Sequence, residues 1–235
     1  MPSPSPLTPV LFSGLVVVVA AGVAWALRRV VGPLGWLTVL AIYIVLPGLL
    51  AARGALDRYT PLPAPALLLL LGLSLLTLAL VASPLGARLA GRLAVGAVVA
   101  FQAFRIPVEL LLHRLYVEGT VPVQMTYSGR NFDVITGLTG LALGLWLLAG
   151  RPAPRGLLRA WNLLGLALFV NIVGVAVLST PTSFRRFLEG PPNLVPSEFP
   201  YVWLPSFLVQ VAWGSHLLVF RQLRPGGLDR PTGSL

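Results

Sequence analysis

Long apolar stretches alternate along the chain with short clusters of Arg, Pro and Gly. A helix that crosses a bilayer needs about 20 mostly apolar residues, and clusters of this kind are where such helices end. Cutting the chain at the clusters leaves seven apolar segments, at residues 7–27, 36–56, 66–83, 93–116, 131–150, 157–180 and 203–221. The pattern predicts an all-α integral membrane protein with seven transmembrane helices, forming one polytopic domain over residues 1–235.

The composition agrees with a membrane protein and excludes several chemistries. Hydrophobic residues make up 56% of the chain and charged residues 10%, whereas a soluble globular domain has about 25% charged residues. The chain has no cysteine, so it can form neither disulfides nor thiolate metal sites. All 17 basic residues are Arg, so no lysine can form a retinal Schiff base. The basic residues flank apolar segments, so the net charge of +10 predicts no nucleic-acid partner.

The arginines also predict an orientation. One side of the predicted membrane has Arg28, Arg29, Arg88, Arg92, Arg151, Arg155, Arg159, Arg221, Arg224 and Arg230, and the other has Arg53, Arg58, Arg114, Arg130, Arg185 and Arg186. Cytoplasmic loops are enriched in basic residues. We therefore expect an external N-terminus and a cytoplasmic C-terminus in the cell membrane, with 117–130 and 181–202 as external loops.

The fourth apolar segment contains ionisable residues where lipid-facing residues are expected. At 100° per residue, one stripe about 80° wide contains Gln102, Arg105, Glu109, His113 and Tyr116. A charged group at the centre of a bilayer costs about 2.5–3.5 kcal/mol to insert, so the stripe is expected to face the helix bundle. The spacing of four predicts an Arg105–Glu109 ion pair, with His113 one turn beyond Glu109.

Other segments and loops contribute polar residues at a similar predicted depth. We expect an outward-opening polar pocket near the outer leaflet, in which Arg105, Glu109, His113 and Asp133 are the candidate catalytic residues. The candidate ligand-binding residues are Gln102, Tyr116, Gln124, Asn131, Asn171 and Gln210.

The chain has two histidines, which limits metal and haem sites. His216 is expected beside Arg221 at the inner interface, about 20 Å deeper than His113 at 1.5 Å per residue, so a haem held by both is disfavoured. His113 and Glu109, or His113 and Asp133, would be the ligands of any zinc ion. The helix number and the Glu-x-x-x-His spacing resemble the intramembrane hydrolases related to alkaline ceramidases and adiponectin receptors. Those proteins use three histidines.

Three classes of function fit this pattern. An enzyme or binder of an amphipathic lipid or small anion would use Glu109 as a base or ligand, His113 as its partner and Arg105 to hold the anion. A proton-coupled small-solute transporter would exchange protons between Glu109 and His113. A structural or assembly subunit of a membrane complex would contact its partner through the external loops. The sequence predicts no oligomeric state.

Overall fold

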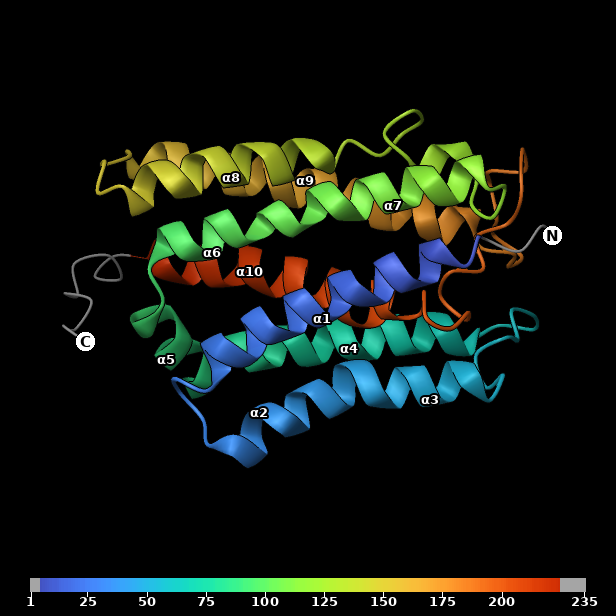
Figure 1. The fold of residues 1–235 in the computed structure, drawn as a ribbon, viewed down its shortest axis with the longest axis horizontal. Helices are drawn as coiled ribbons and strands as arrows, with labels where there is room; N and C mark the ends of the chain where they lie inside the picture. The colour runs from blue at the N-terminus through green and yellow to red at the C-terminus, as the bar shows by residue number, and fades with distance from the viewer. Residues whose placement is uncertain (1–4, 225–235) are drawn as a thin grey trace.

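A computed structural model describes residues 5–224, and these residues contain helices and no strands (Figure 1). Five helical segments are long and apolar enough to cross a membrane: α1 (Leu7–Leu27), Pro33–Ala52, α4 (Pro65–Ala82), Val95–Val117 and α9 (Arg155–Ser179). A shorter apolar helix, α8 (Val134–Leu148), and a segment made of η4 (Leu204–Leu208) and α10 (Val209–Gln222) lie beside them. The prediction of an all-helical chain is confirmed, and the apolar helices are compatible with a multi-pass membrane protein.

The bundle exposes apolar side chains and buries polar ones. Val17, Leu34 and Val170 are 68%, 80% and 60% exposed, whereas Thr8 and Asn162 are fully buried. Soluble domains show the opposite arrangement. An exterior of this kind is suited to hydrocarbon.

Two of the long segments contain irregular turns next to prolines. Pro33–Ala52 consists of α2 (Pro33–Leu40), the π-helical η1 (Ala41–Val45) and α3 (Leu46–Ala52). Pro47 has no N–H to donate to the carbonyl of Tyr43, four residues earlier. That carbonyl instead accepts a hydrogen bond from Ser206 Oγ at 3.2 Å, which ties η1 to η4.

The segment Val95–Val117 has a similar break at its centre. It consists of α6 (Val95–Phe101), the 3₁₀ turn η2 (Gln102–Phe104) and α7 (Arg105–Val117). Pro107 has no N–H to donate to the carbonyl of Ala103, and the N–H of Arg105 donates to the carbonyl of Gln102, three residues earlier, in the tighter turn. Arg105 is therefore the first residue of α7, halfway along the combined segment.

Glycines on α8 allow it to pack closely against α6 and η2. A Cβ on Gly144 would lie 2.3 Å from the backbone nitrogen of Ala100, and one on Gly140 would lie 3.0 Å from the carbonyl oxygen of Val99. A Cβ on Gly137 would lie 3.3 Å from Cβ of Arg105. Small residues of this kind allow helix backbones to approach each other in membranes.

The helix α8 starts deeper in the bundle than the predicted segment 131–150. At 1.5 Å per residue its 15 residues cover about 22 Å, less than the hydrocarbon thickness of about 30 Å. The chain from residue 118 to 133 folds back from the end of α7 to the middle of the bundle (Figure 1). Val121, Thr126 and Asn131 in this re-entrant segment are at most 1% exposed. Irregular backbone at membrane depth requires such covering by protein.

One end of the bundle gathers most of the described arginines. The C-terminal ends of α1, α4, α8 and α10 meet there with the short helix α5 (Pro84–Arg92), which the sequence did not predict (Figure 1). We call this the arginine-rich end, and its arginines are Arg28, Arg29, Arg88, Arg92, Arg151, Arg155, Arg159, Arg221 and Arg224. Arg230, which was assigned to the same side, lies outside the described residues.

Candidate functional site

The centre of the site is Arg105, whose side chain is 2% exposed. Its Nη1 forms a salt bridge with Asp133, and its Nε donates to Gln102 Oε1 at 3.0 Å. Its Nη2 is buried and has no hydrogen-bond partner. The predicted Arg105–Glu109 ion pair is wrong, because the re-entrant segment brings Asp133 to the guanidinium instead.

Asn131 links the two carboxylates of the site. Its Nδ2 donates to Glu109 Oε2 at 2.6 Å and to the carbonyl of Met125 at 3.0 Å. Its Oδ1 accepts from the backbone N–H of Asp133 at 3.0 Å. Asn131 is fully buried and Glu109 is 2% exposed. The last residues of the re-entrant segment thus fix both Glu109 and Asp133 relative to Arg105.

A cavity of about 80 Å³ lies against these residues, and we call it the site cavity. Arg105, Glu109 and Asp133 are its charged lining residues. Much of the remaining lining is apolar, including Phe104, Val108, Phe169, Ile172 and Leu208. The Phe169 ring centroid lies 5.8 Å from Cζ of Arg105, within cation–π range. The lining of the site cavity therefore combines charged side chains with apolar ones.

The outer part of the predicted stripe turns away from this cavity. The ring of His113 stacks on Tyr127 with centroids 4.4 Å apart, and its Nδ1 lies 3.4 Å from Ser128 Oγ. Tyr116 is 38% exposed. The described residues form two salt bridges, and neither involves His113. The predicted Glu109–His113 pairing is wrong, because His113 contacts Tyr127 and Ser128 of the re-entrant segment, whereas Glu109 accepts from Asn131.

Three of the expected ligand-binding residues have other partners. Gln124 donates to Ser179 Oγ at 3.3 Å, and Asn171 donates to the carbonyl of Arg130 at 2.7 Å, so both attach the re-entrant segment to α9. Gln210 forms hydrogen bonds with Thr77 and Ser74 of α4 and lines a different cavity. Of that predicted set, Gln102 and Asn131 contact the charged residues of the site.

His216 is fully buried among α8, α9 and α10, not placed at an interface as predicted. Its Nδ1 donates to Asn162 Oδ1 at 2.8 Å, whereas its Nε2 is buried without a partner. A Cβ on Gly165 would lie 2.6 Å from Cε1 of His216 and 2.9 Å from Cγ2 of Thr136. Thr136 Oγ1 in turn lies 3.5 Å from Asp133 Oδ1. Asn162 and Gly165 lie three residues apart in the predicted segment 157–180. This spacing was the signal in the sequence that this helix contacts a buried polar residue, here His216.

Within residues 5–224, no group of three or more His, Asp or Glu side chains is arranged to hold a metal ion. Comparisons with family models, curated proteins and solved structures found no match for the chain. The geometry around Arg105 is therefore the basis for a functional proposal.

Proposed function

We propose that this chain is a seven-helix membrane protein that binds the uncharged polar group of an amphipathic lipid in the site cavity. The observation that carries the proposal is the position of Arg105. Its guanidinium is buried at a largely apolar cavity, and one of its donor nitrogens has no partner. A ligand acceptor there would satisfy a buried donor that is otherwise costly.

The proposed topology has seven spans, an external N-terminus and a cytoplasmic C-terminus. The five long apolar segments supply most of these spans, and α8 and the η4–α10 segment supply the other two. The arginine-rich end would face the cytoplasm, in keeping with the distribution of positive residues. Asp57, Glu118, Glu189 and Glu198 would then lie on the external side.

The charges of the site favour an uncharged ligand group. Arg105 and Asp133 neutralise each other, so the three charged lining residues sum to zero when Glu109 is protonated and to −1 when it is ionised. In neither state is there net positive charge to attract an anion. An ester carbonyl or a hydroxyl would accept from Arg105 Nη2 without placing another unpaired charge in a low-dielectric interior.

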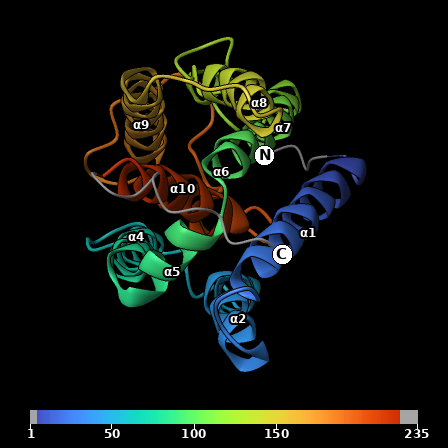
Figure 2. The same cartoon turned by 90° about the vertical axis from the view of Figure 1, so that its left-hand side faces the viewer.

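The apolar part of the ligand would enter from the lipid. Leu67 and Leu70 of α4 and Val173 of α9 line the site cavity and are themselves only partly buried. Figure 2 shows α4 and α9 on opposite sides of α10. A hydrocarbon chain entering on either side of α10, past Leu67 and Leu70 or past Val173, would reach the charged lining residues without crossing a polar surface.

A cavity-filling pair of variants tests this proposal. Ala176 lines the site cavity, whereas Ala167 lies on the exposed face of the same helix. A monoacylglycerol carrying a diazirine should label peptides of α7 and α9 in the wild type. Ala176→Phe should abolish that labelling and Ala167→Phe should preserve it. Equal labelling of the wild type and both variants would contradict the proposal.

A second candidate function is proton transfer coupled to transport. The observation in its favour is that Thr136, whose Oγ1 lies 3.5 Å from Asp133 Oδ1, and the unpartnered Nε2 of His216 both lie beside Gly165. Such chains of ionisable and hydroxyl groups serve as proton relays in transporters. A relay predicts proton flux across liposomes under an imposed pH gradient, with loss of flux in His216→Gln. The binding proposal predicts no flux in either protein.

A further inference from the structure

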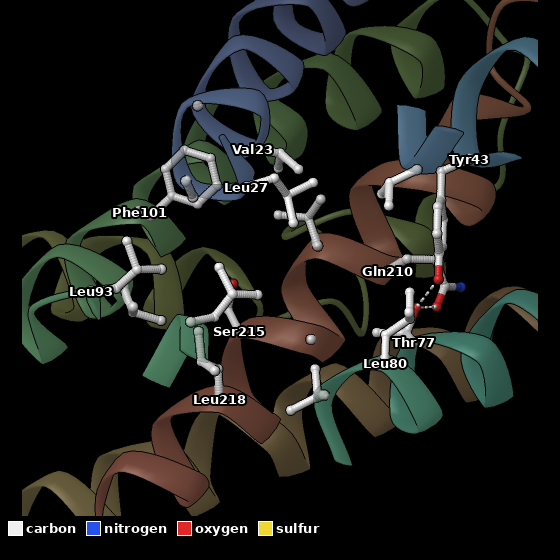
Figure 3. A pocket seen from close by; sticks show the side chains of 18 of the residues that line it. Val23, Leu27, Tyr43, Thr77, Leu80, Leu93, Phe101, Gln210, Ser215 and Leu218 are labelled. Carbon is white, nitrogen blue, oxygen red and sulfur yellow. Dashed lines mark hydrogen bonds between the residues drawn. The ribbon is translucent and has the colours of Figure 1, made fainter. Parts of the chain in front are cut away.

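A second cavity, of about 260 Å³, lies nearer the arginine-rich end (Figure 3). We call it the inner cavity. Its lining residues come from α1, α2, η1, α4, α5, α6, η4 and α10, and most of them are apolar. Its volume approaches the range of about 300–1,000 Å³ that is typical of small-molecule sites. Its lining suits a hydrocarbon chain.

The polar residues at one end of the inner cavity satisfy one another. Tyr43 Oη lies 2.9 Å from Thr77 Oγ1, which donates to Gln210 Oε1 at 3.2 Å (Figure 3). The Nε2 of Gln210 donates to Ser74 Oγ and to the carbonyl of Pro205. An occupant therefore needs no polar group at this end, which suits the tip of an acyl chain.

The opposite end of the inner cavity adjoins three arginines. On α5, Leu85 and Leu89 line the cavity. Arg92 of the same helix donates to the carbonyl of Arg29, and Arg88 Nη1 lies 3.5 Å from the carbonyl of Val30.

The guanidinium of Arg29 covers the ring of Trp25, another lining residue, at 3.9 Å. A positively charged cluster is thus continuous with an apolar chamber.

These arginines have no acidic partner within the described part of the chain. Neither of the two salt bridges among residues 5–224 involves Arg29, Arg88 or Arg92. An amphipathic helix with basic residues on its polar face lies well at an anionic membrane surface. A phosphate from a lipid headgroup would supply the missing negative charge.

We infer that the inner cavity holds one acyl chain of an anionic phospholipid whose phosphate binds Arg29, Arg88 and Arg92. The apolar lining takes the chain and the three guanidiniums take the phosphate, so one molecule satisfies both ends. This lipid is distinct from the uncharged ligand proposed for the site cavity. It enters from the leaflet beside α5.

Native mass spectrometry of the detergent-solubilised protein tests the headgroup contact, with phosphatidylglycerol and phosphatidylcholine as probes. Arg29→Gln/Arg92→Gln should weaken phosphatidylglycerol binding by about tenfold or more. Arg151→Gln/Arg159→Gln is a matched control, because Arg151 also stacks on a tryptophan and Arg159 also donates to a backbone carbonyl. Equal losses in both double variants, or equal binding of phosphatidylcholine by the wild type, would overturn the inference.

A phosphatidylglycerol with a diazirine at the end of one chain tests the cavity itself. In the wild type, labelled peptides should contain lining residues such as Val39, Leu80 and Val211. Ala97→Phe, within the cavity, should remove this labelling, whereas Ala142→Phe on the exposed face of α8 should not. If Ala97→Phe does not fold, the set of peptides labelled in the wild type is the test. Labelling confined to the outward-facing residues Leu34, Leu71 and Leu75 would overturn the inference. Ala176→Phe should leave phosphatidylglycerol binding unchanged, which separates this site from the site cavity.

Discussion

Arg105 and Asp133 form a salt bridge inside the bundle, although they are 28 positions apart in the chain. Their side chains are 2% and 10% exposed. The bridge joins the centre of the α6–α7 segment to the start of α8, and Asn131 extends it to Glu109. The fold of the re-entrant segment and the composition of the candidate site thus depend on the same pair.

Removal of one partner from this pair should destabilise the protein strongly. Breaking a buried ion pair typically costs about 3–5 kcal/mol, because the remaining charge is left uncompensated. Arg105→Gln and Asp133→Asn should each lower the unfolding temperature in detergent more than Arg105→Met/Asp133→Leu does. Arg114→Gln, at a salt bridge with an arginine side chain that is 41% exposed, should have a small effect. A loss in the double variant as large as the sum of the single losses would contradict this interpretation.

Close packing of α8 should make Gly144 intolerant of a side chain. Gly144→Ala places a methyl group 2.3 Å from the backbone nitrogen of Ala100, so α6 and α8 must move apart. We expect a loss of about 1–3 kcal/mol, the usual cost of overpacking. Gly72→Ala is the control, since no atom lies within 4 Å of its added Cβ. Thermal unfolding of both variants is the measurement, and equal stabilities would refute the packing.

The connection between the start of α1 and the end of α7 should depend on pH. Burial raises the pKa of Glu118, but hydrogen bonds from Thr8 and Ser5 and the charge of Arg114 lower the pKa below its usual value overall. A lowered pKa gives a stabilisation that is present above the unfolded pKa of about 4.3 and is lost as pH falls through the folded value. The stability difference between wild type and Glu118→Gln should be constant at neutral pH and shrink as the pH falls below about 4.3. A difference that grows on acidification would contradict the expectation.

The absence of native cysteine makes the proposed topology directly testable. Single cysteines at the exposed positions Glu189 and Arg151 would lie on opposite sides of the membrane. A membrane-impermeant maleimide should label Glu189→Cys in intact cells and Arg151→Cys after permeabilisation alone. The reverse labelling pattern would show that the orientation in the membrane is the opposite of the one proposed.

Hydropathy was sufficient to locate the five long apolar helical segments, because apolar length and Arg, Pro and Gly clusters act locally along the chain. Hydropathy also identified Arg105 and Glu109 as buried groups, because exposing two ionisable residues of one helix to lipid has a high energetic cost. The partner of Arg105 could not be predicted in the same way. The i,i+4 rule favoured Glu109, whereas the tertiary fold supplied Asp133 through a re-entrant segment that no local pattern indicates.

Depth estimates failed for a related reason. Helical phase placed His113 and Tyr116 in the predicted pocket. Phase shows which way a side chain points around its own helix, but it does not show how far along that helix a neighbouring helix extends. His216 was placed at the interface by counting residues from the start of a straight seventh helix. Helices α8 and α9 instead cover His216 from the side, which a count of residues along the seventh helix does not indicate. The helix α5 was missed because its nine residues are too few for a membrane span.

The most direct test of the proposed function is competition for the site cavity by chain-matched alkyl compounds that differ only in their polar group. The measurement is displacement of the diazirine-labelled monoacylglycerol from the wild type by an alcohol, a methyl ester, a carboxylate and a phosphate. Since the charged lining residues carry no net positive charge, the alcohol and the ester should displace the probe more effectively than either anion. Stronger displacement by the carboxylate or the phosphate would contradict the account.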